Sequence, residues 1–408
     1  MDTDTLKREL HVAVDGGNED RVRELLAVME HTCNIDSRDI CSEVLPSAVS
    51  SSSAVIVSLL LDRGADINTA CDSMFETPLG MAVYQGHQDI TSLLLDRGAD
   101  VNAVCDSVYG SALVVAAHER HQNIVSLLLD RGADINALGG DFGSALGVAV
   151  YQGEMDIVLL MLDRGADPNA ICGEQYGSAL GMAVHQGHQN ITSILLDKGA
   201  DINAVCGMHR SALGMAVYGG DQGMVSLLLD RGADVKAICS MFGSVLGMAA
   251  YWGHQNIVSM LLDRGADVNA IGGKRGSALA ITAYQGHQDI TSMLLDRGAD
   301  INAVCGHYGS ALGVAVYRGH QDIVSLLLDR GADVNTMGGV FGSALGAAAY
   351  QGHEHIASLL LDQGADVNIM SSKYGSALSI AEYRGHQNIA SLLLDQKAAV
   401  DVIVAGNR

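Results

Sequence analysis

The apolar positions of this chain recur with a long, regular period. The tripeptide Gly-Ala-Asp returns every 33 or 34 residues from Gly64 onward, and two short apolar segments lie between successive copies. In the unit after Gly64, the apolar positions have the spacing of one helix face in each segment: Leu79, Ala82 and Val83 in the first, and Ile90, Leu93, Leu94 and Leu95 in the second. This spacing predicts two helices per unit, each with one apolar stripe. Because a single pair cannot bury both stripes, we expect neighbouring units to stack.

The repeat covers nearly the whole chain. Gly-Ala-Asp begins at Gly64, Gly98, Gly132, Gly165, Gly199, Gly232, Gly265, Gly298, Gly331 and Gly364, and Lys397-Ala398-Ala399 takes the eleventh place. Two degenerate units precede, so we expect about twelve helix pairs: an atypical capping repeat over 1–41, eleven stacked repeats over 42–397 and a capping tail over 398–408. Ser or Thr before each first helix predicts an N-cap. Gly98 and its equivalents predict left-handed residues after each second helix.

A period of 33 residues with two helices and a turn resembles the ankyrin repeat family, whose consensus includes T-P-L-H-x-A. Thr77-Pro78-Leu79 is the nearest copy here, and many units close with Gly-Ala-Asp-Val-Asn-Ala. Ser-Ala-Leu after a Tyr-Gly or Phe-Gly turn is similar to the long arrays of filamentous fungi. The resemblance implies an all-α solenoid with a concave groove, lined by the ends of the first helices and by the turns between units, that binds partners.

Aromatic side chains fall at only three places in the repeat, and we expect all of them to lie outside the aliphatic core. One place is the end of the first helix: Tyr84, Tyr151, Tyr218, Tyr251, Tyr284, Tyr317, Tyr350 and Tyr383, with His118 and His185 in two units. The next residue is polar in most units, as at Arg318, but is Trp252 in one. The third place is the turn before the first helix, which holds Phe142, Tyr176, Phe242 and Tyr308 among others. These residues are the predicted partner-binding surface.

Glycine occupies the inside of most first helices, at the place where the ankyrin consensus has His. Such a Gly costs about 1 kcal/mol relative to Ala, so a structural reason is expected. Each lies four residues before the helix-end ring, and the ring of Tyr84 is therefore expected to lie across Gly80. Two interpretations of the row of rings stay open: packing within each repeat, or a surface offered to a ligand.

Basic and aromatic exceptions to the repeat gather in units seven to nine, where we centre the predicted site. They are His209, Arg210, Tyr251, Trp252, Lys274 and Arg275. Such a cluster suits a carboxylate or phosphate group. The leading hypothesis is a non-catalytic scaffold for a protein or peptide partner. The alternative is an enzyme or small-molecule binder with a pocket between Tyr218, Tyr251, Trp252 and Tyr284. No catalytic motif is recognisable, so we lean against an enzyme.

Charge and cysteine usage limit the class of partner. A formal net charge of −23 argues against nucleic acid and anionic membranes, which need a cationic surface. Six of the eight Cys share one repeat position, and stacked helices about 8 to 10 Å apart cannot bridge them. We therefore expect reduced thiols, no metal or other cofactor, and a monomer in the cytoplasm. The recurrent Gly-His that opens each second helix is interpreted as structural.

Overall fold

The computed structural model describes residues 3–31, 37–71, 77–103, 110–139, 143–172, 176–206, 211–238, 242–271 and 276–406, with side chains described for residues 4–397. The chain divides into two compact units, residues 1–201 and 202–408, called here the N-terminal and C-terminal units. The described part is built almost entirely from short helices, so the all-α prediction is confirmed.

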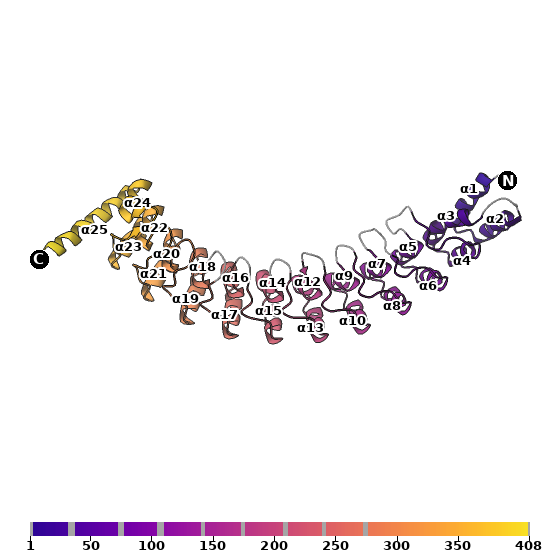
Figure 1. The fold of residues 1–408 in the computed structure, drawn as a ribbon, viewed down its shortest axis with the longest axis horizontal. Helices are drawn as coiled ribbons and strands as arrows, with labels where there is room; N and C mark the ends of the chain where they lie inside the picture. Colours follow the sequence, from indigo (N-terminus) through magenta and orange to yellow (C-terminus); the bar gives the residue numbers. More distant parts are fainter. Residues whose placement is uncertain are drawn as a thin grey trace. The chain divides into compact units, whose positions relative to one another are not determined.

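The N-terminal unit is a succession of helix pairs. Its helices are α1 (Thr3–Asp15), α2 (Glu19–His31), α3 (Ser37–Ser50), α4 (Ala54–Asp62), α5 (Pro78–Tyr84), α6 (Gln88–Asp96), α7 (Ala112–His118), α8 (Gln122–Asp130), α9 (Ala145–Gln152), α10 (Met155–Asp163), α12 (Ala179–His185) and α13 (Gln189–Asp197). First helices contact first helices of adjacent pairs, as α7 contacts α9, and second helices contact second helices, as α6 contacts α8. Figure 1 shows the two resulting rows, α5 to α12 and α6 to α13.

The C-terminal unit repeats this arrangement. Its elements are α14 (Ala212–Gly219), α15 (Gln222–Asp230), α16 (Val245–Trp252), α17 (Gln255–Asp263), α18 (Ala278–Gln285), α19 (Gln288–Asp296), α20 (Ala311–Arg318), α21 (Gln321–Asp329), α22 (Ala344–Gln351), α23 (Glu354–Asp362), β1 (Met370–Ser371), β2 (Gly375–Ser376), α24 (Ala377–Arg384) and α25 (Gln387–Gly406). Helices α16, α18, α20, α22 and α24 pack in sequence as neighbours, and Figure 1 shows α15 to α23 as the second row.

Two predicted repeat boundaries fall inside helices. The boundary between residues 41 and 42 lies within α3, and the boundary between 397 and 398 lies within α25. In the structure, residues 398–406 therefore continue the last helix.

Local capping follows the sequence prediction. Ser144 has extended backbone, and its hydroxyl accepts the Gly147 N–H at 3.1 Å at the start of α9. Gly98 follows α6 with φ +92°, a left-handed conformation that glycine adopts without a steric penalty. Each of these caps satisfies backbone groups that a short helix leaves without partners.

The core lies between the helix rows, and its composition differs slightly from the prediction. Ile90 and Leu94 of α6 are buried, whereas Leu93 and Leu95 are only half-buried. The fully buried neighbour is Thr91, whose hydroxyl donates to the His87 carbonyl at 2.8 Å. A β-branched polar residue is accommodated there because the preceding turn of the helix satisfies its hydroxyl.

Polar ladders join each repeat to the next. Asn102 donates from Nδ2 to the Gly132 carbonyl at 3.2 Å and accepts the Asp134 N–H at 2.8 Å. In several repeats the Asp that ends the second helix forms an ion pair with the cation of the following repeat, at 2.5 to 2.9 Å: Asp62–Arg97, Asp96–Arg131, Asp130–Arg164, Asp163–Lys198, Asp230–Arg264, Asp263–Arg297 and Asp296–Arg330. Much of the acidic composition thus belongs to the scaffold.

Hairpin-like turns precede the first helices. Strands β1 and β2 pair antiparallel, with Met370 opposite Ser376. Isolated bridges join Leu138 to Ser144 and Ile171 to Ser178 in the equivalent place of earlier repeats. In these three repeats, the residue before the turn therefore pairs with the serine that caps the first helix.

Candidate functional site

The helix-end aromatic residues lie at the surface of both units. Within the described part, their side chains are exposed at Tyr84, Tyr151, His185, Tyr218, Trp252 and Tyr383, and half-buried at His118, Tyr251, Tyr284, Tyr317 and Tyr350. The following residue Arg318 is exposed as well. Tyr84 and Tyr218 are 39% and 45% exposed, values far above those of the aliphatic core. Each ring stands at the end of its first helix, where the backbone turns toward the second helix.

The aromatic residues of the turns are more buried than those at the helix ends. Tyr176 and Tyr308 are half-buried, but Phe242 and Phe341 are only 8% and 6% exposed. The prediction that no aromatic side chain is buried is wrong for these two phenylalanines. Lacking a hydroxyl, Phe loses nothing to desolvation when it packs between a turn and a helix. Phe142, His209, Arg210, Lys274 and Arg275 lie outside the described residues.

Turn rings and helix-end rings interleave in the C-terminal unit. Tyr308 lies 6.1 Å from Tyr284 of the preceding repeat and 4.3 Å from Tyr317 of its own, between ring centroids. Phe341 lies 5.5 Å from Tyr317 and 4.6 Å from Tyr350. The chain of rings ends at Tyr374, with its centroid 5.6 Å from that of Tyr350. We call Tyr284, Tyr308, Tyr317, Phe341, Tyr350 and Tyr374 the aromatic row. Such pairs stabilise by about 0.5 to 1.5 kcal/mol beyond burial.

The aromatic row changes the chemistry of one phenol. Burial, followed by the neighbouring hydroxyls of Tyr317 and Tyr284, raises the pKa of Tyr308, and Arg318 opposes the shift. Tyr308 therefore remains a neutral hydrogen-bonding group at physiological pH.

Trp252 forms a separate aromatic contact. Its indole lies edge-on to Tyr218, at 5.5 Å and 90°, and to Tyr251, at 5.2 Å and 89°. Phe242 supports Tyr251 from below, with centroids 4.9 Å apart. The indole is nevertheless 45% exposed. In the N-terminal unit a smaller cluster joins Tyr151, Tyr176 and His185, with centroids 6.4 and 5.1 Å apart.

The carbonyl groups of most helix-end tyrosines receive donors from the next repeat. Gln285 Nε2 and His287 Nε2 both lie 3.3 Å from the Tyr251 oxygen. At Tyr284 the same two places are filled by Arg318 Nε and His320 Nε2, each at 3.2 Å. These bonds fix the backbone from which the rings project.

The recurrent histidines have a structural reason that involves the neighbouring repeat. A Cβ placed on Gly253 would lie 2.8 Å from the His287 ring, and one on Gly319 would lie 2.8 Å from the His353 ring. These glycines also have φ values of +75°. The imidazole therefore packs on the bare backbone of the preceding repeat, which supports the structural interpretation of the Gly-His pattern.

Glycines inside the first helices make room for the preceding turn. A Cβ on Gly247 would lie 2.6 Å from the Phe242 carbonyl oxygen, and one on Gly313 would lie 2.7 Å from the Tyr308 oxygen. The expected packing of the Tyr84 ring across Gly80 stays a prediction. The chain of the turn passes so close to the helix that any side chain would collide with it.

Cysteines among the described residues are buried free thiols: Cys41, Cys71, Cys172, Cys206 and Cys305. Burial raises the pKa of Cys41 and of Cys172 to about 11. A thiolate nucleophile is therefore scarce at these two positions near neutral pH.

Three polar residues, Thr282 of α18, Glu382 of α24 and His355 of α23, depart from the repeat pattern. Thr282 is buried, donates to the Leu279 carbonyl at 2.9 Å and accepts the Thr291 hydroxyl at 3.0 Å. Glu382 and His355 are exposed.

Sequence reasoning missed a row of exposed aliphatic side chains in the turns. They occupy one repeat position and are 50% to 76% exposed: Leu138, Ile171, Val205, Ile238, Ile271, Val304, Met337 and Met370. Their signal was available in the sequence, because an aliphatic residue recurs immediately before the Cys or Gly of the turn. We call these residues the aliphatic row.

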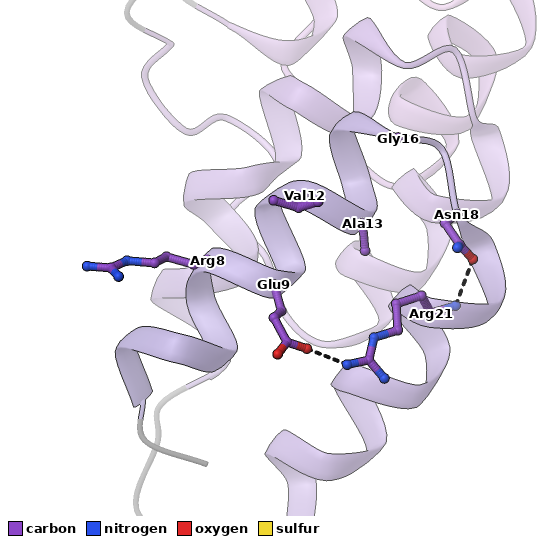
Figure 2. Close-up of a pocket in the computed structure, with 7 residues that line it drawn as sticks. All are labelled: Arg8, Glu9, Val12, Ala13, Gly16, Asn18 and Arg21. Carbon is purple, nitrogen blue, oxygen red and sulfur yellow. Dashed lines mark hydrogen bonds and ion pairs between the residues drawn. The ribbon is translucent and has the colours of Figure 1, made fainter.

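Two hollows lie in the N-terminal unit. The larger, of about 420 Å³, lies between α1 and α2 and is lined by Arg8, Glu9, Val12, Ala13, Gly16, Asn18 and Arg21 (Figure 2). Arg21 pairs with Glu9 across it, whereas Arg8 points away. The second, of about 320 Å³, is lined by Gly86, Arg120 and His121 among others. Neither contains the residues of the pocket expected around Trp252.

The comparisons agree with the repeat architecture. A family model described as ankyrin repeats (3 copies) matches residues 10–105, 48–139, 104–172, 146–239, 180–272, 246–338 and 339–404. None of the curated proteins compared matches the chain. In the described part, no helix has both the length and the apolar character that crossing a membrane requires. Helix pairs of regular period, packed first helix to first helix and matched by this model along almost the entire sequence, show that the chain belongs to the ankyrin repeat family.

Proposed function

We propose that this chain is a non-catalytic interaction module that binds a protein or an extended peptide through the rings at the ends of its first helices. Ankyrin repeats are in general protein-interaction modules. The observation that carries the proposal is that no helix-end tyrosine in the described part is buried, although eight repeats supply one. A folding requirement alone would favour burying such large side chains.

The side chains at the ends of the first helices suit a protein partner. Tyr and Trp offer large contact areas, lose little conformational entropy on binding and concentrate binding energy in interfaces. Trp252 stands out because the equivalent residue in other repeats bonds to a neighbouring carbonyl group, as Gln285 and Gln351 do. The indole instead packs perpendicular to the Tyr218 ring and is 45% exposed.

Affinity capture with three forms of the full chain tests the proposal. The forms are wild type, the double variant Tyr251→Ala with Trp252→Ala, and a matched variant Ile238→Ser with Ile271→Ser. The second pair removes exposed apolar side chains of the aliphatic row in the same region. Circular dichroism checks that all three remain helical.

The proposal expects one discrete protein that is retained by wild type and by the Ile variant and lost by the ring variant. Loss with the Ile variant alone would move the binding surface to the aliphatic row. Unchanged capture together with loss of a bound metabolite would favour the alternative, a small-molecule site.

A further inference from the structure

Two arginines on the ring-bearing side of the C-terminal unit are held in one geometry. The Arg318 guanidinium carbon lies 4.5 Å from the centroid of Tyr284, and its Nε donates to the Tyr284 carbonyl at 3.2 Å. Arg384 repeats this on Tyr350, at 4.3 and 3.1 Å. Because one nitrogen and one face of each guanidinium are engaged, both side chains are oriented before any ligand arrives.

Arg318 and Arg384 differ from the arginines that follow the second helices, because no carboxylate of the described residues forms an ion pair with them. The cations after the second helices, such as Arg297 and Arg330, bond to an Asp of the preceding repeat at 2.9 and 2.7 Å. Within the part of the chain that the structure describes, Arg318 and Arg384 have no carboxylate within 4.0 Å. Their terminal Nη groups remain available, and these are the atoms that bind carboxylate or phosphate in a fork.

The charge of the surrounding sequence supports this difference. Segments 304–318, 337–351 and 370–384 form the turns and first helices of three successive repeats, and Glu382 is their one acidic residue. The same segments carry Arg318, Lys373 and Arg384, in a chain whose formal charge is −23. Screening over about 8 Å at physiological ionic strength limits the effect of the distant carboxylates.

The hydrogen bond to the tyrosine carbonyl of the preceding repeat does not need a charged donor. Gln285 Nε2 donates to the Tyr251 carbonyl at 3.3 Å, and Gln351 Nε2 donates to the Tyr317 carbonyl at 3.2 Å. Neutral Gln thus makes the same contact from the same repeat position. Arg318 and Arg384 add a cation–π contact with a tyrosine ring, yet within the described residues neither has a carboxylate to balance its charge.

We propose that Arg318 and Arg384 are anion subsites for an acidic, extended segment of the partner, whose carboxylate or phosphate groups bind the Nη atoms while its other side chains lie on the aromatic row. This inference rests on the proposed function. The two arginines are two repeats apart, which is roughly 16 to 20 Å at about 8 to 10 Å per stacked helix. An extended chain rises about 3.3 Å per residue, so the anionic residues are expected about six positions apart.

Fluorescence anisotropy with labelled synthetic peptides tests the inference. The probes are a Tyr- and Pro-containing peptide with two Glu residues six positions apart, its Gln-for-Glu counterpart, and a phosphoserine-for-Glu version. The proteins are wild type, Arg318→Gln with Arg384→Gln, and Tyr251→Ala with Trp252→Ala. The Gln variant keeps the carbonyl bonds that Gln285 and Gln351 make, and equal thermal midpoints check that its fold is intact.

Wild type is expected to bind the Glu peptide about 10-fold more tightly than the Gln peptide, the size expected for charge-assisted hydrogen bonds. The Arg-to-Gln variant should lose this preference and keep its affinity for the Gln peptide. Comparison of the Glu and phosphoserine peptides then identifies the preferred anion.

Equal binding of the Glu and Gln peptides by wild type, no binding of either, or an undiminished preference in the Arg-to-Gln variant would overturn the inference. The proposed function stands or falls separately. If the Arg variant retains the captured partner while the Tyr251 and Trp252 variant loses it, the module is correct and the anion subsites are wrong.

Discussion

Arg120 and Glu154 form an ion pair at 3.1 Å in the place where other repeats set a histidine ring against a glycine. Arg120 follows α7 with φ +61°, a left-handed conformation that a non-glycine residue adopts at a cost. The equivalent pair one repeat later is Gly153 with His188, where a Cβ would lie 2.9 Å from the imidazole. The two residues have therefore changed together: a side chain replaces the glycine, and a carboxylate replaces the ring it would strike.

The double variant Arg120→Gly with Glu154→His is expected to raise the free energy of unfolding by about 1 kcal/mol. It removes the left-handed Arg, which costs about 1 kcal/mol or more, and gives up an exposed ion pair worth at most about 1 kcal/mol. The new imidazole is expected to form a hydrogen bond with the His118 carbonyl, as His287 does with the Tyr251 carbonyl. Urea denaturation followed by circular dichroism measures the change.

Glu154→His alone should lower the free energy of unfolding, because the new imidazole ring would collide with the Arg120 side chain. A single variant as stable as the double variant would show that the two positions are independent.

Gly253→Ala is expected to destabilise the protein more than Gly265→Ala. Both glycines have positive φ, +75° and +85°, so both variants carry a backbone penalty of about 1 kcal/mol or more. Only at Gly253 would the added Cβ meet another side chain, 2.8 Å from the His287 ring. Displacing that ring also weakens its bond to the Tyr251 carbonyl. We expect a further loss of about 1 to 2 kcal/mol, and equal urea midpoints for the two variants would contradict the imidazole packing.

Trp252 is the single tryptophan of the chain and therefore reports on the ring surface directly. Because its indole is 45% exposed, fluorescence should be quenched by iodide and acrylamide to nearly the extent seen in urea-unfolded protein. Binding of a partner over Tyr218 and Trp252 should shift the emission to shorter wavelength and reduce iodide quenching. Emission that resists iodide in the free protein would place the indole inside the repeat stack.

Cys172 should make the folded state less stable as the solution becomes alkaline. Burial raises the pKa of its thiol to about 11, whereas the unfolded thiol ionises near pH 8.5. Between these values the unfolded state loses a proton that the folded state keeps, so stability present below about pH 8.5 falls as pH rises toward 11. The loss is up to about 3 kcal/mol.

Urea unfolding of wild type and Cys172→Ala across that pH range isolates the thiol from tyrosine and lysine titration. The difference in free energy of unfolding between wild type and Cys172→Ala should become smaller as the pH rises. Parallel curves would contradict the shift in the pKa of Cys172.

The repeat, the family and the local structure of each unit can all be predicted from the amino-acid sequence. The apolar spacing around Leu79 and Ile90 predicts the helices, and Ser144 and Gly98 predict their caps. These interactions join residues only a few positions apart, so a local sequence pattern is enough to predict them. Exposure of Tyr84 and Tyr218 also agrees with the sequence prediction.

Contacts that join one repeat to the next, or a turn to its helix, could not be predicted in this way. The burial of Phe242 and the collision that keeps Gly313 bare depend on how closely the turn approaches the helix. The packing of His287 on Gly253 joins residues more than 30 positions apart. No local pattern encodes such distances, because they arise when whole repeats stack and side chains from different units compete for the same space.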